Sequence, residues 1–243
     1  MERQIHSWFS PSLQKEMPVA VYGSYGFALL LIPTAAADYL EYERFQLIES
    51  LRPFIEAGKI KVFSIDSINR ESWMNYEMEG RHKIIRHRQW NDYVYNEIIP
   101  FIKQHTSWDT PVIACGASFG ALHSANLFFK RPDMLNGCIA LSGVYDLTEY
   151  SRGYFDDDVY FNSPMHYMPN LQDHVILEQI RQSNHIHIFS GSGDYEDPDS
   201  GRRFAEILYR KGIWYDLDIW GSEWKHDWPT WCHALPAILS TKF

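Results

Sequence analysis

Short apolar runs alternate with longer segments of helical spacing along most of this 243-residue chain. The runs expected to form buried strands are residues 27–32, 60–65, 111–115, 137–141 and 186–189. They are apolar almost throughout, as expected of central parallel strands, because such strands are covered on both faces. Alternation of strand and helix predicts an α/β fold, in which a mainly parallel central sheet carries helices on both faces.

The remaining segments complete this pattern without a linker or an internal repeat. Residues 3–9, 17–22 and 214–220 are predicted strands, the first two forming an antiparallel start to the sheet. Helices are predicted over residues 39–56, 81–104, 121–130, 201–211 and 228–239, and an irregular stretch over 145–170. The length suits one core. We therefore expect a single domain over residues 1–243, with a possible lid-like insertion at about 147–170.

Charge and cysteine content exclude several classes of partner. The formal net charge is -9 and no run of Lys or Arg occurs, so nucleic acid is not an expected partner. Residues 1–11 lack a signal-peptide core and the longest apolar run, residues 28–37, is too short to cross a bilayer. We expect a cytoplasmic protein without a membrane partner. Cys115, Cys138 and Cys232 are few and far apart, which predicts reduced thiols.

The sequence Gly116-Ala117-Ser118-Phe119-Gly120 lies between a predicted buried strand and a predicted helix. A serine on such a tight turn is exposed above the sheet edge, and the flanking glycines let the strand and the helix pack closely. We therefore predict that Ser118 is a nucleophile and that the amide of Phe119 faces a developing oxyanion. The alternative is a turn of small residues without chemistry.

A serine hydroxyl is a weak nucleophile unless a histidine removes its proton. His226 follows the last predicted strand and precedes the closing helix, at the edge of the sheet where such folds bind ligands. The other histidines considered lie within or beside helices and strands, where packing is their usual role: His123, His185, His187 and His233. We predict that His226 is the general base.

The histidine needs an acid to orient it, and the loop after the strand at 186–189 offers three carboxylates. They are Asp194, Glu196 and Asp197, and an acidic loop can also simply cap the following helix. No choice among them follows from the residue pattern alone.

Three segments together resemble the putative-esterase family of α/β-hydrolases, which includes feruloyl esterases, S-formylglutathione hydrolases and the mycobacterial antigen 85 mycolyltransferases. They are the Ser118 motif, the sequence Leu141-Ser-Gly-Val-Tyr-Asp146, and residues 221–231. The sequence His226-Asp-Trp-Pro-Thr-Trp231 is similar to the family's His-x-Trp-x-x-Trp segment, which contains the catalytic histidine. The resemblance covers about residue 29 to the C-terminus and implies an α/β-hydrolase fold.

The resemblance also suggests the acid and the second oxyanion donor. Related esterases place the acid a few residues past a glycine that ends the strand, which favours Asp194 after Gly191. Asp197 is the alternative, because other members have Glu-Asp-Pro after this strand. By alignment the second donor is the amide of Ala35, although many members have glycines where this chain has Pro33-Thr-Ala-Ala-Ala37.

Aromatic residues outside these motifs are candidates for binding substrate. Trp73, Tyr154 and Tyr160 could line an aromatic acyl or sugar site, or could cover the core as part of an ordered surface loop. The adjacent carboxylates of residues 156–158 point in different directions, so no metal site is expected there, and we expect no cofactor.

The expected function is a serine esterase that hydrolyses a small-molecule carboxylic ester through a Ser-Asp-His triad and an acyl-enzyme intermediate. An acyltransferase with the same triad, or a non-catalytic binding module with a hydrolase fold, are the alternatives. A homo-oligomer is also possible.

Overall fold

The computed structural model describes the backbone of residues 1–243 and every side chain except that of Glu149. Its backbone contains one sheet of eight strands in the order β1-β2-β4-β3-β5-β6-β7-β8. The β1–β2 and β2–β4 pairs are antiparallel and all other neighbours are parallel. The strands are β1 (Arg3–Ser10), β2 (Lys15–Tyr22), β3 (Phe27–Ile32), β4 (Ile60–Ile65), β5 (Val112–Ala117), β6 (Gly137–Leu141), β7 (Ile186–Ser190) and β8 (Asp216–Ile219).

Helices fill most of the connections between the strands. They are α1 (Glu41–Arg44), α2 (Leu47–Ser50), α3 (Arg52–Glu56), α4 (Gly80–Tyr93), α5 (Ile99–His105), α6 (Phe119–Lys130), α7 (Thr148–Ser151), α8 (Asp157–Tyr160), α9 (Pro164–Asn170), α10 (His174–Gln182), α11 (Pro198–Arg210) and α12 (Trp228–Lys242). A short 3₁₀ helix covers Asn69–Glu71, and a π-helical turn, Val94–Ile98, joins α4 to α5. Within the described part of the chain, none of these helices combines the length and the apolar character needed to span a bilayer.

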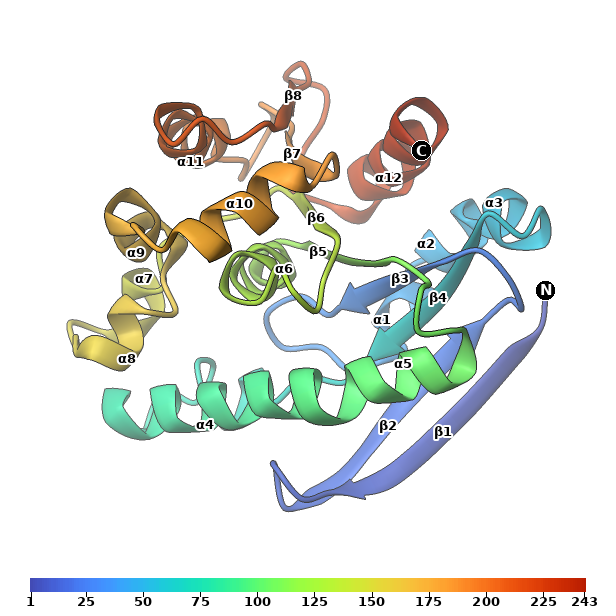
Figure 1. The fold of residues 1–243 in the computed structure, drawn as a ribbon, viewed down its shortest axis with the longest axis horizontal. Coiled ribbons are helices and arrows are strands. Elements are labelled where there is room, and N and C mark those ends of the chain that lie inside the picture. Colours follow the sequence, from blue (N-terminus) through green and yellow to red (C-terminus); the bar gives the residue numbers. More distant parts are fainter.

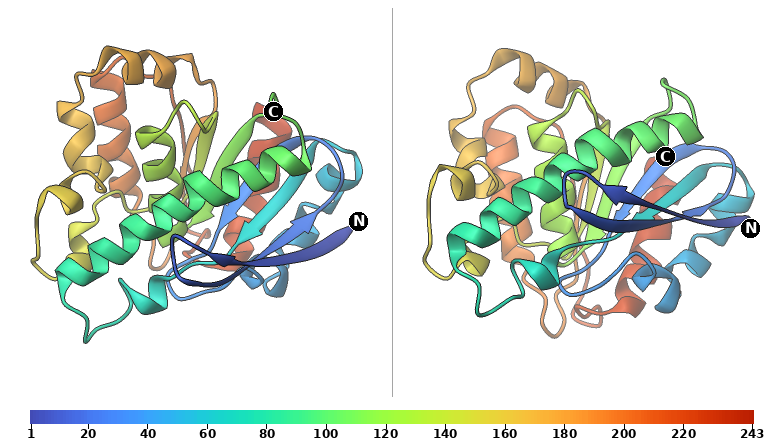
Figure 2. Two further views of the ribbon diagram at one scale, coloured as in Figure 1. Left: turned by 60° about the horizontal axis from the view of Figure 1, so that its bottom comes forward. Right: turned by 90° about the horizontal axis from the view of Figure 1, so that it is seen from below.

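The helices cover both faces of the sheet, which confirms the predicted α/β class (Figures 1 and 2). Alternate residues of β3 show how the two layers form. Leu30 packs on the side of α4, α5, α6 and α9 to α11, whereas Leu29 and Leu31 pack on the side of α1 to α3 and α12. All three leucines are fully buried, and each such side chain contributes about 1.5–3 kcal/mol to folding.

The order of the last four strands determines where the site forms. Since β5, β6, β7 and β8 are consecutive parallel neighbours, the segments that follow them lie side by side at one edge of the sheet. These segments begin at Ser118, Ser142, Gly191 and Trp220. Open α/β sheets bind ligands at this carboxyl edge.

The stretch 147–170 was predicted to be irregular and possibly lid-like, but it contains the short helices α7, α8 and α9. The helix predicted over 39–56 is instead three short helices, α1 to α3. Gln46, with φ 67°, separates the first two, because a left-handed residue cannot continue a right-handed helix.

Candidate active site

Ser118 occupies a strained turn between β5 and α6. Its backbone has φ 56° and ψ -120°, a conformation that residues other than glycine rarely adopt. Its amide donates a hydrogen bond to the carbonyl of Leu141 at the end of β6, at 2.9 Å. The turn therefore fixes Ser118 at the carboxyl edge of the sheet, where the residue is partly exposed.

The two glycines of the motif allow a close approach of backbone segments. A Cβ on Gly116 would lie 2.4 Å from the backbone of Gly120, and a Cβ on Gly120 would lie 2.4 Å from the carbonyl oxygen of Ile32. Tyr42 joins the same strands from the other face of the sheet. Its buried hydroxyl donates to the carbonyl of Ile32 at 2.7 Å and accepts from the amide of Ala117 at 3.1 Å. The ends of β3 and β5 are thus held together beneath Ser118.

His226 and Glu196 form a pair in the loops after β8 and β7. The Nδ1 atom of His226 lies 3.4 Å from Oε2 of Glu196, and the glutamate side chain is 0% exposed, against 24% for the histidine. The hydroxyl groups of Ser142 and Ser190 donate to the two carboxylate oxygens of Glu196 at 2.6 and 3.1 Å. Trp231 donates from Nε1 to the Ser142 oxygen at 2.9 Å. The buried carboxylate of Glu196 is therefore held by three partners, which are Ser142, Ser190 and His226.

These contacts decide the charge of Glu196. Burial by itself raises the pKa of this carboxyl group, but the hydrogen bonds from His226 and Ser142 outweigh burial, so the pKa is lowered from its usual value. Glu196 is therefore an anion at neutral pH. It lies where an orienting acid must lie, against the Nδ1 atom of the histidine.

The acid predicted from the sequence, Asp194, lies outside this network. Its carboxylate forms an ion pair with Lys225 at 2.6 Å, and both side chains are exposed. Only the Asp194 carbonyl contacts the histidine, by accepting a hydrogen bond from the amide of His226 at 3.0 Å. The following residue, Tyr195, has φ 66°, so the chain reverses there and directs Glu196 inward instead. The preference for Asp194 is therefore corrected.

The alternative acid, Asp197, is also outside the network. It is the N-cap of α11, where its carboxylate accepts from the amide of Ser200 at 3.2 Å, and it lies 3.5 Å from Arg203. This is the helix-capping role considered for the acidic loop. The sequence carries no signal that singles out Glu196, because the left-handed residue that positions it is a tyrosine and not a glycine.

The predicted oxyanion donors, Phe119 and Ala35, meet in one cluster of side chains next to Ser118. Phe119 is the first residue of α6, where amides have no partner within the helix. Ala35 packs against the cluster of buried residues that contains Phe119. Its loop is held by Glu41, whose carboxylate accepts from the amide and the hydroxyl of Thr34 at 2.9 and 2.6 Å. A carboxylate thus supports the loop that contains Ala35.

The three predicted substrate residues lie in different surroundings. Trp73 is 1% exposed and donates from Nε1 to Nδ1 of His87 at 3.2 Å, so it is part of the core, and the expectation that it lines an open site is wrong. Tyr160 lines a separate cavity with Lys130 at the far end of α6. Tyr154 is half-buried and packs against the cluster that contains Phe119.

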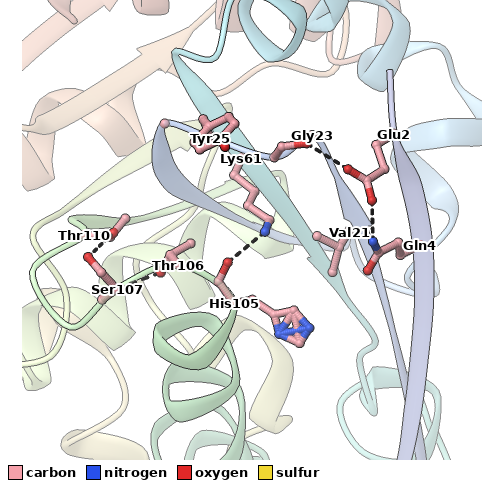
Figure 3. A pocket seen from close by; sticks show the side chains of 12 residues that line it. Glu2, Gln4, Val21, Gly23, Tyr25, Lys61, His105, Thr106, Ser107 and Thr110 are labelled. Atoms are coloured by element: carbon pink, nitrogen blue, oxygen red, sulfur yellow. Dashed lines mark hydrogen bonds between the residues drawn. The ribbon is translucent and has the colours of Figure 1, made fainter.

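A cavity of about 450 Å³ lies at the opposite edge of the sheet (Figure 3). It is lined by Gly26 and Thr110, which precede β3 and β5, and by Lys61, whose Nζ donates to the carbonyl of His105 at 2.8 Å. These residues lie at the amino ends of the parallel strands. The cavity is therefore not part of the site around Ser118.

A serine on a strained strand-to-helix turn, followed along the chain by an acid and a histidine at the carboxyl edge of the sheet, defines an α/β-hydrolase of the serine type. Residues 42–241 match the family described as Putative esterase. The chain belongs to that family, and this makes it a serine hydrolase of the carboxylic ester class. No curated protein sequence matches the chain at a significant level.

Solved structures with the same fold span nearly the whole chain. An S-formylglutathione hydrolase from Staphylococcus aureus is 16% identical, with a TM-score of 0.69 over 98% of this chain and 97% of that one. A ferulic acid esterase from Anaeromyces mucronatus, in complex with ferulic acid, is 15% identical, with a TM-score of 0.66 over 100% and 90%. MPT51 of Mycobacterium tuberculosis is 16% identical, with a TM-score of 0.67 over 99% and 97%. The predicted fold and the resemblance to these groups are confirmed.

Proposed function

We propose that this esterase hydrolyses a small carboxylic ester through Ser118, His226 and Glu196, with an acyl-enzyme intermediate. The observation that supports this most strongly is the buried, ionised Glu196 at Nδ1 of His226. An acid at Nδ1 keeps the proton on that nitrogen, so that Nε2 is free to accept the proton of a serine hydroxyl.

In the first half of the reaction, Oγ of Ser118 attacks the ester carbonyl while His226 takes its proton. The amides of Phe119 and Ala35 stabilise the oxyanion of the tetrahedral intermediate. When this intermediate collapses, His226 returns the proton to the leaving alcohol and the acyl group stays on Ser118. A water molecule then repeats the sequence and releases the carboxylic acid.

Glu196 stays ionised through both halves and stabilises the imidazolium that forms on His226. Ser142 and Ser190 act on the reaction through Glu196, because their hydrogen bonds fix the position of its carboxylate, and Trp231 in turn donates to the Ser142 oxygen.

The substrate class is taken from the relatives. One structural relative is an S-formylglutathione hydrolase and another binds ferulic acid, so we propose that the ester hydrolysed by this chain carries either a short acyl group or an aromatic acyl group. A panel of p-nitrophenyl esters of rising chain length, together with a feruloyl ester and S-formylglutathione, would identify the preferred acyl group through kcat/KM.

Labelling with a fluorophosphonate probe tests the mechanism directly. The expected result is an adduct of one probe per chain on the wild-type protein, seen as an intact-mass shift, and no adduct on Ser118→Ala. A matched control is Ser107→Ala, which removes an exposed serine at the opposite edge of the sheet and should label like the wild type. The absence of an adduct on the folded wild-type protein would instead favour a non-catalytic binding module.

A further inference from the structure

A second cavity, of about 360 Å³, lies among α6, α8, α9 and α10. Its walls are mostly apolar and include Phe129, Tyr160, Phe161, Leu171 and Ile176. Phe161 is 57% exposed, which leaves a large apolar ring at the surface of the protein. Concave, largely apolar surfaces with a few polar groups are typical of small-molecule binding sites.

This cavity is separate from the catalytic site. The helix α6 begins directly after Ser118 and ends at Lys130, which lines the cavity. With 12 residues in α6 and a rise of about 1.5 Å per residue, the two ends are about 18 Å apart. Figure 1 shows α6 beside α9 and α10, on one face of the sheet. Neither His226 nor Glu196 lines this cavity.

Lys130 is the only charged residue among those that line the cavity. Its Nζ donates one hydrogen bond, to the neutral Oδ1 of Asn162 at 3.0 Å, and an ammonium group has three donors. Among the described side chains, no carboxylate forms an ion pair with Lys130. The acid that faces it from α8, Asp158, is paired with Arg88 at 2.9 Å. The lining of this apolar cavity therefore includes a lysine that is not paired directly with a carboxylate among the described side chains.

The surroundings of Lys130 also affect its protonation. Burial, together with the positive charge of Arg88, lowers the pKa of Lys130 to about 8, although Asp158 and Asp92 act in the opposite direction. The ammonium form still predominates at pH 7, and an anion bound beside it would favour that form further.

We propose that this cavity binds a small amphiphilic carboxylate, whose apolar chain or ring lies against the aromatic wall and whose carboxylate pairs with the ammonium group of Lys130. The charge complementarity follows from the lining, which contains one cation and no acid. The exposed amide of Gln172, also in the lining, is able to donate a further hydrogen bond to the same carboxylate. This binding is independent of the proposed triad.

The first test measures how a model ligand protects Lys130 from acetylation. Ser118→Ala protein is treated with limiting acetic anhydride at pH 8, and the modification rate of Lys130 is followed by peptide mass spectrometry. We expect 4-phenylbutyrate to slow this rate at least about fivefold, and its neutral isostere 4-phenylbutyramide to slow it less than about twofold, because only the carboxylate pairs with the ammonium group. Lys59, which is exposed at a remote site, serves as the internal reference.

The second test uses binding variants that do not touch the proposed triad. Lys130→Met removes the charge, and Gln172→Glu places an acid in the lining at an exposed position without changing the side-chain shape. Each should raise the Kd of 4-phenylbutyrate, measured by calorimetry, at least about fivefold. Gln104→Glu, an exposed change on α5, is the matched control and should leave the Kd unchanged.

The inference is overturned if 4-phenylbutyrate leaves the acetylation of Lys130 unchanged, or if the neutral amide protects equally well. It is also overturned if Gln172→Glu binds the carboxylate as tightly as Gln104→Glu does. Since neither ligand is an ester and the binding variants leave the proposed triad unchanged, these outcomes are the same whether or not the protein hydrolyses esters.

Discussion

Replacing Glu196 with glutamine is the sharpest test of the proposed acid, because the change removes a charge and keeps the shape. The carboxylate lies 3.4 Å from Nδ1 of His226, so its loss leaves the histidine free to adopt the wrong tautomer. In triads of this kind the isosteric amide costs about 10⁴-fold in kcat, which corresponds to about 5 kcal/mol of transition-state stabilisation. We expect a loss of that order for Glu196→Gln.

The same change should have a much smaller effect on stability. Ser142 and Ser190 each donate a hydrogen bond to one carboxylate oxygen of Glu196. In the variant the amide carbonyl still accepts from one serine, whereas the amide nitrogen faces the other. One net hydrogen bond is lost, so the free energy of unfolding should fall by about 1–3 kcal/mol. Far-ultraviolet circular dichroism and a thermal melt would show that the variant is folded.

Two neighbouring carboxylates provide matched controls. Asp194→Asn breaks an ion pair with Lys225 between two exposed side chains, which contributes little to stability and has no expected effect on rate. Asp197→Asn keeps a good N-cap residue for α11, so both rate and stability should change little. The assay is kcat and KM with p-nitrophenyl acetate beside the melting temperature. If either aspartate variant loses the rate while Glu196→Gln stays within about tenfold of wild type, the assignment of Glu196 is refuted.

Three further changes test how the site and its surroundings are held. Ser142→Ala removes a hydrogen bond that lowers the pKa of Glu196, so the acidic limb of the kcat/KM profile should move to higher pH; an unmoved limb would contradict this role. Burial lowers the pKa of His123 to about 3, whereas in the unfolded chain His123 becomes protonated below about pH 6.5. The free energy of unfolding should therefore fall as the pH drops below about 6.5, and His123→Gln should reduce this fall, measured by urea unfolding at pH 5 and 7. An equal fall in the variant and the wild type would contradict this role of His123. Gly120→Ala places a Cβ 2.4 Å from a backbone oxygen and should cost at least about 2 kcal/mol in the same unfolding assay, whereas a neutral result would show that the backbone relaxes.

Much of the fold could be predicted because buried strands leave a simple trace in the sequence. The strands Phe27–Ile32, Ile60–Ile65 and Gly137–Leu141 have the bounds predicted from uninterrupted apolar runs. The sequence did not predict the breaks in the helix expected over 39–56. The reason is that α1, α2 and α3 bury their apolar residues on the same side of the sheet, so these residues recur at the spacing of one continuous helix. The helix His174–Gln182 was not predicted at all.

The site was predictable where a residue is tied to the end of an element. Ser118 and His226 both lie at the carboxyl edge of the sheet, as predicted, because one joins β5 to α6 and the other lies between β8 and α12. The acid could not be chosen this way, since three carboxylates occur within four residues of one loop. Similarly, nothing in the sequence shows that Trp73 is buried in the core and does not line an open site.

Three residues at the carboxyl edge of the sheet share a backbone property. Ser118, Ser142 and Tyr195 follow β5, β6 and β7, and all three have positive φ angles, of 56°, 51° and 66°, without being glycine. Such conformations cost about 1–3 kcal/mol each and persist only where the surroundings fix them. Here the sheet does so, because the amides of Ser118 and Ser142 extend its ladder to Leu141 and Phe189 at 2.9 and 2.7 Å. The geometry of the site therefore depends on pairing between strands that are distant in sequence. The local backbone preferences of serine and tyrosine disfavour these positive φ angles, so they do not predict the geometry.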